Sequence, residues 1–138
     1  MLLVGLKPVS PSNSEAAARR DLSARAASFF CIWMLPILIA AGVGLATNLP
    51  WMIAAAWSAA FTWTGIACLL NAQRCGRLHC YFSGPILLGG AVLVAALALS
   101  VVDFGPHGLG LIVATTLILA ALTYGLERIW GRYRRSNR

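Results

Sequence analysis

Four cysteines and one histidine are the residues of this chain whose types and spacing could do chemistry. Cys75 and Cys80 enclose a short basic sequence that also holds His79, in the order CGRLHC. Two thiols at this spacing beside an imidazole can converge on one soft cation, because thiolate sulfur favours Cu(I), Zn(II) or Hg(II). The sequence therefore predicts a metal site here, and a purely structural loop is the competing interpretation.

The other two cysteines, Cys31 and Cys68, lie in apolar stretches, each about one turn inside an expected membrane span. One interpretation is that they bind a soft ion within the membrane and pass it to the loop thiols. The other is that they only fill space, because free cysteine is among the most buried residue types. A reducing compartment keeps all four as thiols, which argues against structural disulfides.

The composition indicates a membrane protein. Of 138 residues, 59% are hydrophobic and 11% are charged, and the charges gather in three short stretches with apolar runs of about 20 residues between them. The net charge of +7 is not arranged as a basic stripe interleaved with aromatic residues, so we expect no nucleic-acid partner. We predict an all-α integral membrane four-helix bundle in a lipid bilayer.

The four spans must position the candidate site. Apolar runs predict helices over about 27–46, 50–72, 85–102 and 108–126, within a membrane domain of residues 27–127. A short turn precedes Pro50, which suits the first position of a helix, and Ser83 is the expected cap of the third span. Pro36 predicts a kink just beyond Cys31. Residues 1–26 form an N-terminal segment with a surface helix expected from Glu15 to Ser28, and residues 128–138 form a basic tail.

The distribution of positive charge predicts the orientation. Every Lys and Arg lies in the N-terminal segment, the middle loop or the tail, and short loops rich in these residues stay cytoplasmic. We therefore expect both termini on the cytoplasmic side of a prokaryotic inner membrane. Arg74 and Arg77 are topology determinants in this interpretation, although they would also favour thiolate in the loop. The tail arginines can contact anionic lipid or an acidic partner: Arg128, Arg132, Arg134, Arg135 and Arg138.

On the opposite side, Asp103 and His107 bracket a short turn. They are candidates for capturing a cation before it enters, and a solvated turn is the alternative. The chain has no phosphate-binding glycine loop, no paired carboxylates and no His-Glu-x-x-His helix, so we expect no enzyme.

Residues 71–85, NAQRCGRLHCYFSGP, resemble the signature of a group of uncharacterised small prokaryotic membrane proteins. The resemblance covers the second span, the loop and the third span, and it implies no activity. More loosely, the layout is similar to the mercuric-ion transport proteins. That similarity implies that Cys75 and Cys80 are an intracellular acceptor pair, but the chain lacks the closely spaced cysteine pair of those proteins in its first span.

Three functions follow from these observations. The first is binding or transport of a soft ion, Hg, Cu or Zn, by Cys31 and Cys68 in the membrane and by Cys75, His79 and Cys80 at the cytoplasm. The second is a non-catalytic accessory subunit whose faces of small residues pack against partner subunits or a second copy. The third is a redox-active or zinc-clamped loop that only stabilises the turn.

Overall fold

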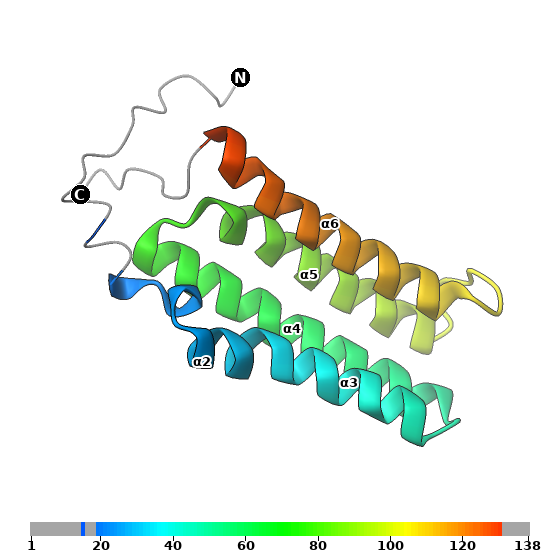
Figure 1. The fold of residues 1–138 in the computed structure, drawn as a ribbon. Helices are drawn as coiled ribbons and strands as arrows, with labels where there is room; N and C mark the ends of the chain where they lie inside the picture. The colour runs from blue at the N-terminus through cyan, green and yellow to red at the C-terminus, as the bar shows by residue number, and fades with distance from the viewer. Residues whose placement is uncertain (1–14, 16–18, 131–138) are drawn as a thin grey trace.

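A computed structural model describes Glu15 and residues 19–130, and it contains helices and no strand in that part of the chain (Figure 1). A short 3-10 helix, η1, comes first. It is followed by a continuous first helix made of α2, a π-helical turn η2 and α3, and then by three long helices. The bounds are η1 Leu22–Ala24, α2 Ala26–Phe29, η2 Phe30–Met34, α3 Leu35–Ala46, α4 Pro50–Cys75, α5 Leu78–Ala98 and α6 Gly108–Trp130.

Four stretches of helix are long and apolar enough to cross a membrane, which confirms the predicted all-α class and the number of long apolar helices. They are Ala26–Ala46, Pro50–Cys75, Leu78–Ala98 and Gly108–Gly125. The shortest has 18 residues, and at about 1.5 Å per residue it covers most of a hydrocarbon core about 30 Å thick. Many large apolar side chains point outward, as suits a lipid environment: Leu38, Leu45, Val92 and Leu122 are all more than half exposed.

The helices lie side by side in chain order, with α4 and α5 at the centre (Figure 1). The packing of α4 against α5 is the most extensive, and it depends on two glycines. A Cβ atom on Gly65 would lie 3.1 Å from the Gly84 carbonyl oxygen, and a Cβ atom on Gly84 would lie 3.3 Å from the Gly65 oxygen. Small residues let helix backbones approach closely where lipid provides no hydrophobic drive for association. Phe61 and Val94, both completely buried, belong to the hydrophobic core.

The predicted start of the third span at residue 85 was wrong. α4 continues to Cys75, Gly76 ends it in the left-handed conformation (φ 69°), and α5 begins at Leu78. The pair Gly84-Pro85 favours a helix start, but here Ser83 is not a cap and Pro85 lies inside α5. Its exposed position leaves the ring on the outer side of the helix, while Gly84 packs against α4. The expected loop is therefore a turn of only two residues, Gly76 and Arg77.

The first helix starts at Ala26 and ends at Ala46, and Pro50 begins α4, as predicted. The π-helical turn η2 directly precedes α3, which has Pro36 in its first turn. The kink expected from Pro36 stays a prediction. The expected surface helix of residues 15–28 is interrupted, because Asp21 is extended (φ −78°, ψ 110°) and caps η1. α6 continues to Trp130, so Arg128 belongs to a helix. The tail arginines Arg132, Arg134, Arg135 and Arg138 lie outside the described residues.

We predict that Gly65→Ala destabilises the protein relative to Gly42→Ala. The new Cβ at position 65 would lie 2.9 Å from Leu88 Cγ and 3.1 Å from the Gly84 carbonyl oxygen, whereas nothing lies within 4 Å at position 42. Both changes bring the same gain in helix propensity, so the difference isolates the packing cost, about 1–3 kcal/mol. Unfolding in micelles measures it, and equal stabilities would contradict the close approach.

Candidate thiol site

Two cysteines from adjacent helices meet at the end of the molecule that carries the α4–α5 turn. The side chains of Cys68 in α4 and Cys80 in α5 interact with each other, and they are 2% and 0% exposed. Helices α4 and α5 are antiparallel, and Gly65 lies opposite Gly84. Cys80 comes four residues before Gly84, so it lies opposite the residue four positions after Gly65, which is next to Cys68. The glycine contact therefore determines which thiols meet.

Further donors are directed at Cys68. The Trp33 indole Nε1 donates to Cys68 Sγ at 3.0 Å, and the Ser83 hydroxyl donates to the same sulfur at 3.4 Å. Trp33 comes from the π-helical turn η2, and Phe29 stacks on it with ring centroids 5.8 Å apart. Donors that converge on one acceptor stabilise negative charge on it. The Cys68 sulfur is therefore oriented by three of the four long helical segments: the first helix, α4 and α5.

His79 lies beside Cys80, as the sequence predicted, but it does so from the first turn of α5 and not from a loop. Its Nε2 atom is 3.3 Å from Cys80 Sγ. The imidazole is 1% exposed and stacks on Tyr124 of α6, with ring centroids 4.0 Å apart. Asn71 Nδ2 donates to Cys80 Sγ at 3.7 Å. The thiol pair is thereby connected to every long helix of the molecule.

The remaining two cysteines do not belong to this pair. The Cys75 thiol is buried and donates to the Asn71 carbonyl oxygen at 3.0 Å. Cys31 is exposed on the outer side of the first helix. The structure places Cys68 with Cys80, a pairing that the sequence did not suggest. The suggested pairings of Cys75 with Cys80 and of Cys31 with Cys68 stay predictions.

The site offers few ligands. Across Glu15 and residues 19–130, no group of three or more His, Cys, Asp and Glu side chains is placed to hold a metal ion. A structural zinc site normally takes four such ligands, so this arrangement does not favour zinc. Two adjacent thiols suit a soft ion that accepts two-coordinate binding, as Cu(I) and Hg(II) do.

A buried ion pair that the sequence interpretation missed fastens the N-terminal segment over this end. Arg77 Nη1 donates to Asp21 Oδ2 at 2.6 Å and to Ser23 Oγ at 2.5 Å. Asn71 Nδ2 donates to Asp21 Oδ1 at 2.9 Å, and Asn71 Oδ1 accepts from the Leu22 amide at 3.0 Å. Arg77 therefore binds a carboxylate and is more than a topology determinant. Figure 1 shows the blue segment around η1 against the green end of α4.

Asn71 is the junction between this ion pair and the thiols. Its amide donates to Asp21 on one side and to Cys80 on the other. Every buried side-chain nitrogen and oxygen in the described part of the chain has a hydrogen-bond partner. The sequence held one signal for the pair: Asp21 is a lone acid among Arg19, Arg20 and Arg25.

The environment of Asp21 changes its acidity. Burial alone would raise the pKa of its carboxyl group, but hydrogen bonds from Asn71, Ser23 and Arg77 outweigh burial and hold the pKa below the ordinary value of 3.8. Asp21 is therefore a carboxylate whenever the segment is docked near neutral pH.

The other candidate residues stand apart. Asp103 Oδ1 accepts from the Gly105 amide at 2.7 Å, a local turn contact, and both Asp103 and His107 are exposed. The carboxylate thus has a partner other than His107, which favours the solvated turn. Arg74 is exposed near the end of α4.

Comparison with protein-family models, curated proteins and solved structures finds no match to this chain. The resemblance of residues 71–85 to small prokaryotic membrane proteins, and the looser similarity to mercuric-ion transport proteins, stay predictions.

We predict that acid weakens the protein through Asp21. Because the folded-state pKa of Asp21 lies below 3.8, its contribution is complete above about pH 4 and is lost as pH falls through the folded-state value. Asp21→Asn should abolish this acid dependence, and at neutral pH it should already cost about 3 kcal/mol by leaving Arg77 without its counterion. Unfolding in micelles at pH 7 and pH 3 measures both effects. An acid-induced loss of the same size in the variant would contradict the assignment.

Proposed function

We propose that this chain is an integral membrane protein, with both termini in the cytoplasm, that binds a soft metal ion between Cys68 and Cys80. The observation that carries the proposal is that two buried thiols from adjacent helices lie beside each other, with the Ser83 hydroxyl of α5 donating to the Cys68 sulfur of α4 at 3.4 Å. The arginines near the α4–α5 turn and in the C-terminal tail support a cytoplasmic location for that end.

The chemistry of the pair favours Cu(I) or Hg(II). Two thiolates neutralise Hg(II) and leave a single negative charge with Cu(I), so the bound ion places little net charge in a region of low dielectric. His79 Nε2 lies 3.3 Å from Cys80 Sγ, beside the proposed pair of ligands. Trp33 and Ser83 would act as outer partners that orient the Cys68 sulfur.

The location of the pair supports an acceptor role. In the proposed orientation the thiols lie toward the cytoplasmic end, beneath the segment held by Asp21 and Arg77. An ion that reaches them is close to cytosolic thiols that could accept it. Cys31 is exposed away from this pair, so it takes no part in the proposed site.

We predict that reduced protein binds one Cu(I) and that Cys68→Ser and Cys80→Ser each remove this binding. The loss should exceed the roughly 10- to 100-fold that the removal of an outer partner costs. Competition with a chromogenic Cu(I) chelator measures it. The double variant Cys31→Ser with Cys75→Ser is the matched control and should bind as the natural protein does. If that control loses the ion while the Cys68 and Cys80 variants retain it, the proposal fails.

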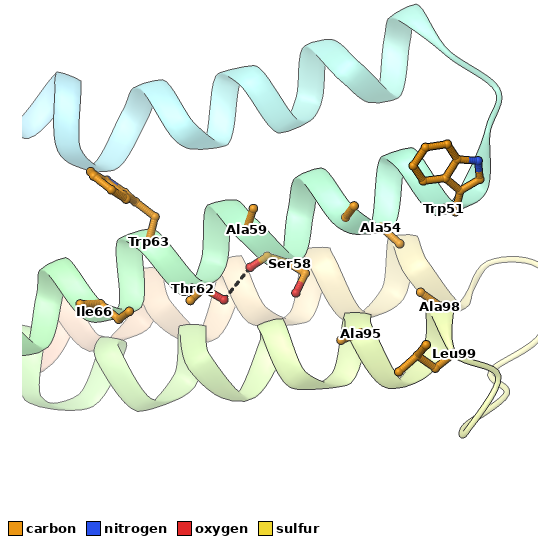
Figure 2. A pocket seen from close by; sticks show the side chains of 11 residues that line it. Trp51, Ala54, Ser58, Ala59, Thr62, Trp63, Ile66, Ala95, Ala98 and Leu99 are labelled. Carbon is orange, nitrogen blue, oxygen red and sulfur yellow. Dashed lines mark hydrogen bonds between the residues drawn. The ribbon is translucent and has the colours of Figure 1, made fainter.

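An accessory role in a larger membrane complex is the second candidate, and a groove on the outer face of α4 and α5 favours it. The groove has a volume of about 640 Å³. Its floor is made of small residues, and Trp51 and Trp63 stand toward its two ends (Figure 2). The Trp63 side chain is 61% exposed. Small residues beside aromatic ones suit a close contact with a partner helix in lipid.

The accessory role predicts that Ala59→Leu, which fills the groove, releases the protein from a larger complex. Ala114→Leu is the matched control, because Ala114 is exposed on α6 outside the groove. Mild detergent extraction from cells at natural expression level, followed by native electrophoresis, measures the size of the assembly. Migration of the natural protein as a lone monomer would contradict this role.

A further inference from the structure

We infer that Cys68 and Cys80 form a reversible redox pair, a dithiol that a small peroxide converts to a disulfide between α4 and α5. This activity goes beyond metal binding, because it requires no ion and uses the thiols as reductants.

The backbone geometry allows the bond. A disulfide requires Cα atoms within about 7 Å and side chains directed at each other. The approach of Gly65 to Gly84 brings the two helices to backbone contact one turn from the thiols. The Ser83 hydroxyl, one turn after Cys80 on α5, donates to Cys68 Sγ at 3.4 Å, so the two cysteines lie on the facing sides of the two helices. Closing the bond therefore needs only a small side-chain movement.

The surroundings of the two sulfurs differ, and this assigns their roles. Cys68 Sγ accepts from Trp33 Nε1 and from the Ser83 hydroxyl, so it is the sulfur better able to carry negative charge and to attack an oxidant. Cys80 lies between the Cys68 sulfur and the Asn71 amide. It is placed to react second, with the oxidised Cys68.

The reaction balances with hydrogen peroxide as the oxidant. The Cys68 sulfur attacks one peroxide oxygen, the O–O bond breaks, and the products are a sulfenic acid on Cys68 and one water. The Cys80 sulfur then attacks the Cys68 sulfur, the S–O bond breaks, and the hydroxyl leaves with the Cys80 proton as a second water. Two thiols are oxidised to one disulfide and the peroxide is reduced to two waters. Reduction by a dithiol reagent returns the starting state.

Burial selects the oxidant. The two thiols are at most 2% exposed, and the segment held by the Asp21–Arg77 pair covers their end of the molecule. A bulky disulfide such as oxidised glutathione therefore has no direct access, whereas hydrogen peroxide has the size of a few atoms. Cys31 is exposed, unlike the two buried thiols of the pair.

Peroxide oxidation of the full chain in lipid nanodiscs tests the inference. The protein is reduced, a metal chelator is added, and hydrogen peroxide is applied before the free thiols are alkylated. Peptide mass spectrometry should show a bond between Cys68 and Cys80, with Cys31 and Cys75 alkylated. In Cys80→Ser, a sulfenic acid should accumulate on Cys68 and react with dimedone when the protein is unfolded in its presence. In Cys68→Ser, position 80 should yield no dimedone adduct.

The hydrogen-bond donors to Cys68 Sγ allow a second test, which measures the rate of oxidation. Ser83→Ala removes one hydrogen bond to Cys68 Sγ and should slow oxidation about five-fold, the size of effect expected from one such bond. Ser58→Ala is the matched control, because the Ser58 hydroxyl donates to the Ala91 carbonyl oxygen on the same helix pair, away from the thiols. Unchanged helical circular dichroism shows that each variant folds.

Two results would overturn the inference. One is a Cys68–Cys80 pair that stays reduced while Cys31 or Cys75 is oxidised. The other is a Cys80→Ser variant in which Cys68 gives no dimedone adduct. Because the chelator excludes metal, protein that binds Cu(I) but forms no disulfide would refute only this inference, and protein that forms the disulfide but binds no Cu(I) would refute only the proposed metal function.

Discussion

The contact between the backbones of α4 and α5 at Gly65 and Gly84 is the constraint on which the rest of the site depends. Each glycine faces the carbonyl oxygen of the other, at distances that a side chain would disturb. In lipid the helices gain nothing from hiding apolar surface, so close packing of this kind holds them together. The contact also fixes the offset of the two helices along their axes. That offset places Cys68 beside Cys80 and brings the Ser83 hydroxyl to the Cys68 sulfur.

The polar network at the same end depends on complete pairing. Removing two charges from water is costly, and the pair of Asp21 with Arg77 is acceptable because Ser23 and Asn71 satisfy the remaining polar atoms. Asn71 serves both this network and Cys80. A change in the docking of the N-terminal segment would therefore alter the hydrogen bonding of Cys80, although the two sites belong to different parts of the chain.

The sequence allowed the helices to be predicted, but not the contacts between them. Apolar runs between charged stretches predicted four membrane-length helices, and Pro50 marked the start of one of them correctly. Gly84 and Pro85 predicted a helix start that does not occur, because Gly84 is needed inside a helix to meet Gly65. The thiol pairing was beyond prediction for the same reason: it follows from the offset of two helices, which no local pattern encodes. The four cysteines and His79 were recognised as candidates, whereas Asp21, Asn71 and Trp33 were missed because their roles come from residues distant in the chain.

The central claim is that the Cys68 and Cys80 sulfurs are neighbours in the folded protein, and thiol counting in a register scan tests it most directly. Both chains to be compared carry Cys31→Ser and Cys75→Ser, and the second also carries Cys80→Ser with Phe82→Cys, which moves the thiol to an exposed position of α5. After oxidation by hydrogen peroxide in native membranes, the protein is unfolded and its free thiols are counted. Our account predicts that both thiols disappear in the first chain and that both remain in the second. Equal loss in the two chains, or no loss in the first, would contradict it.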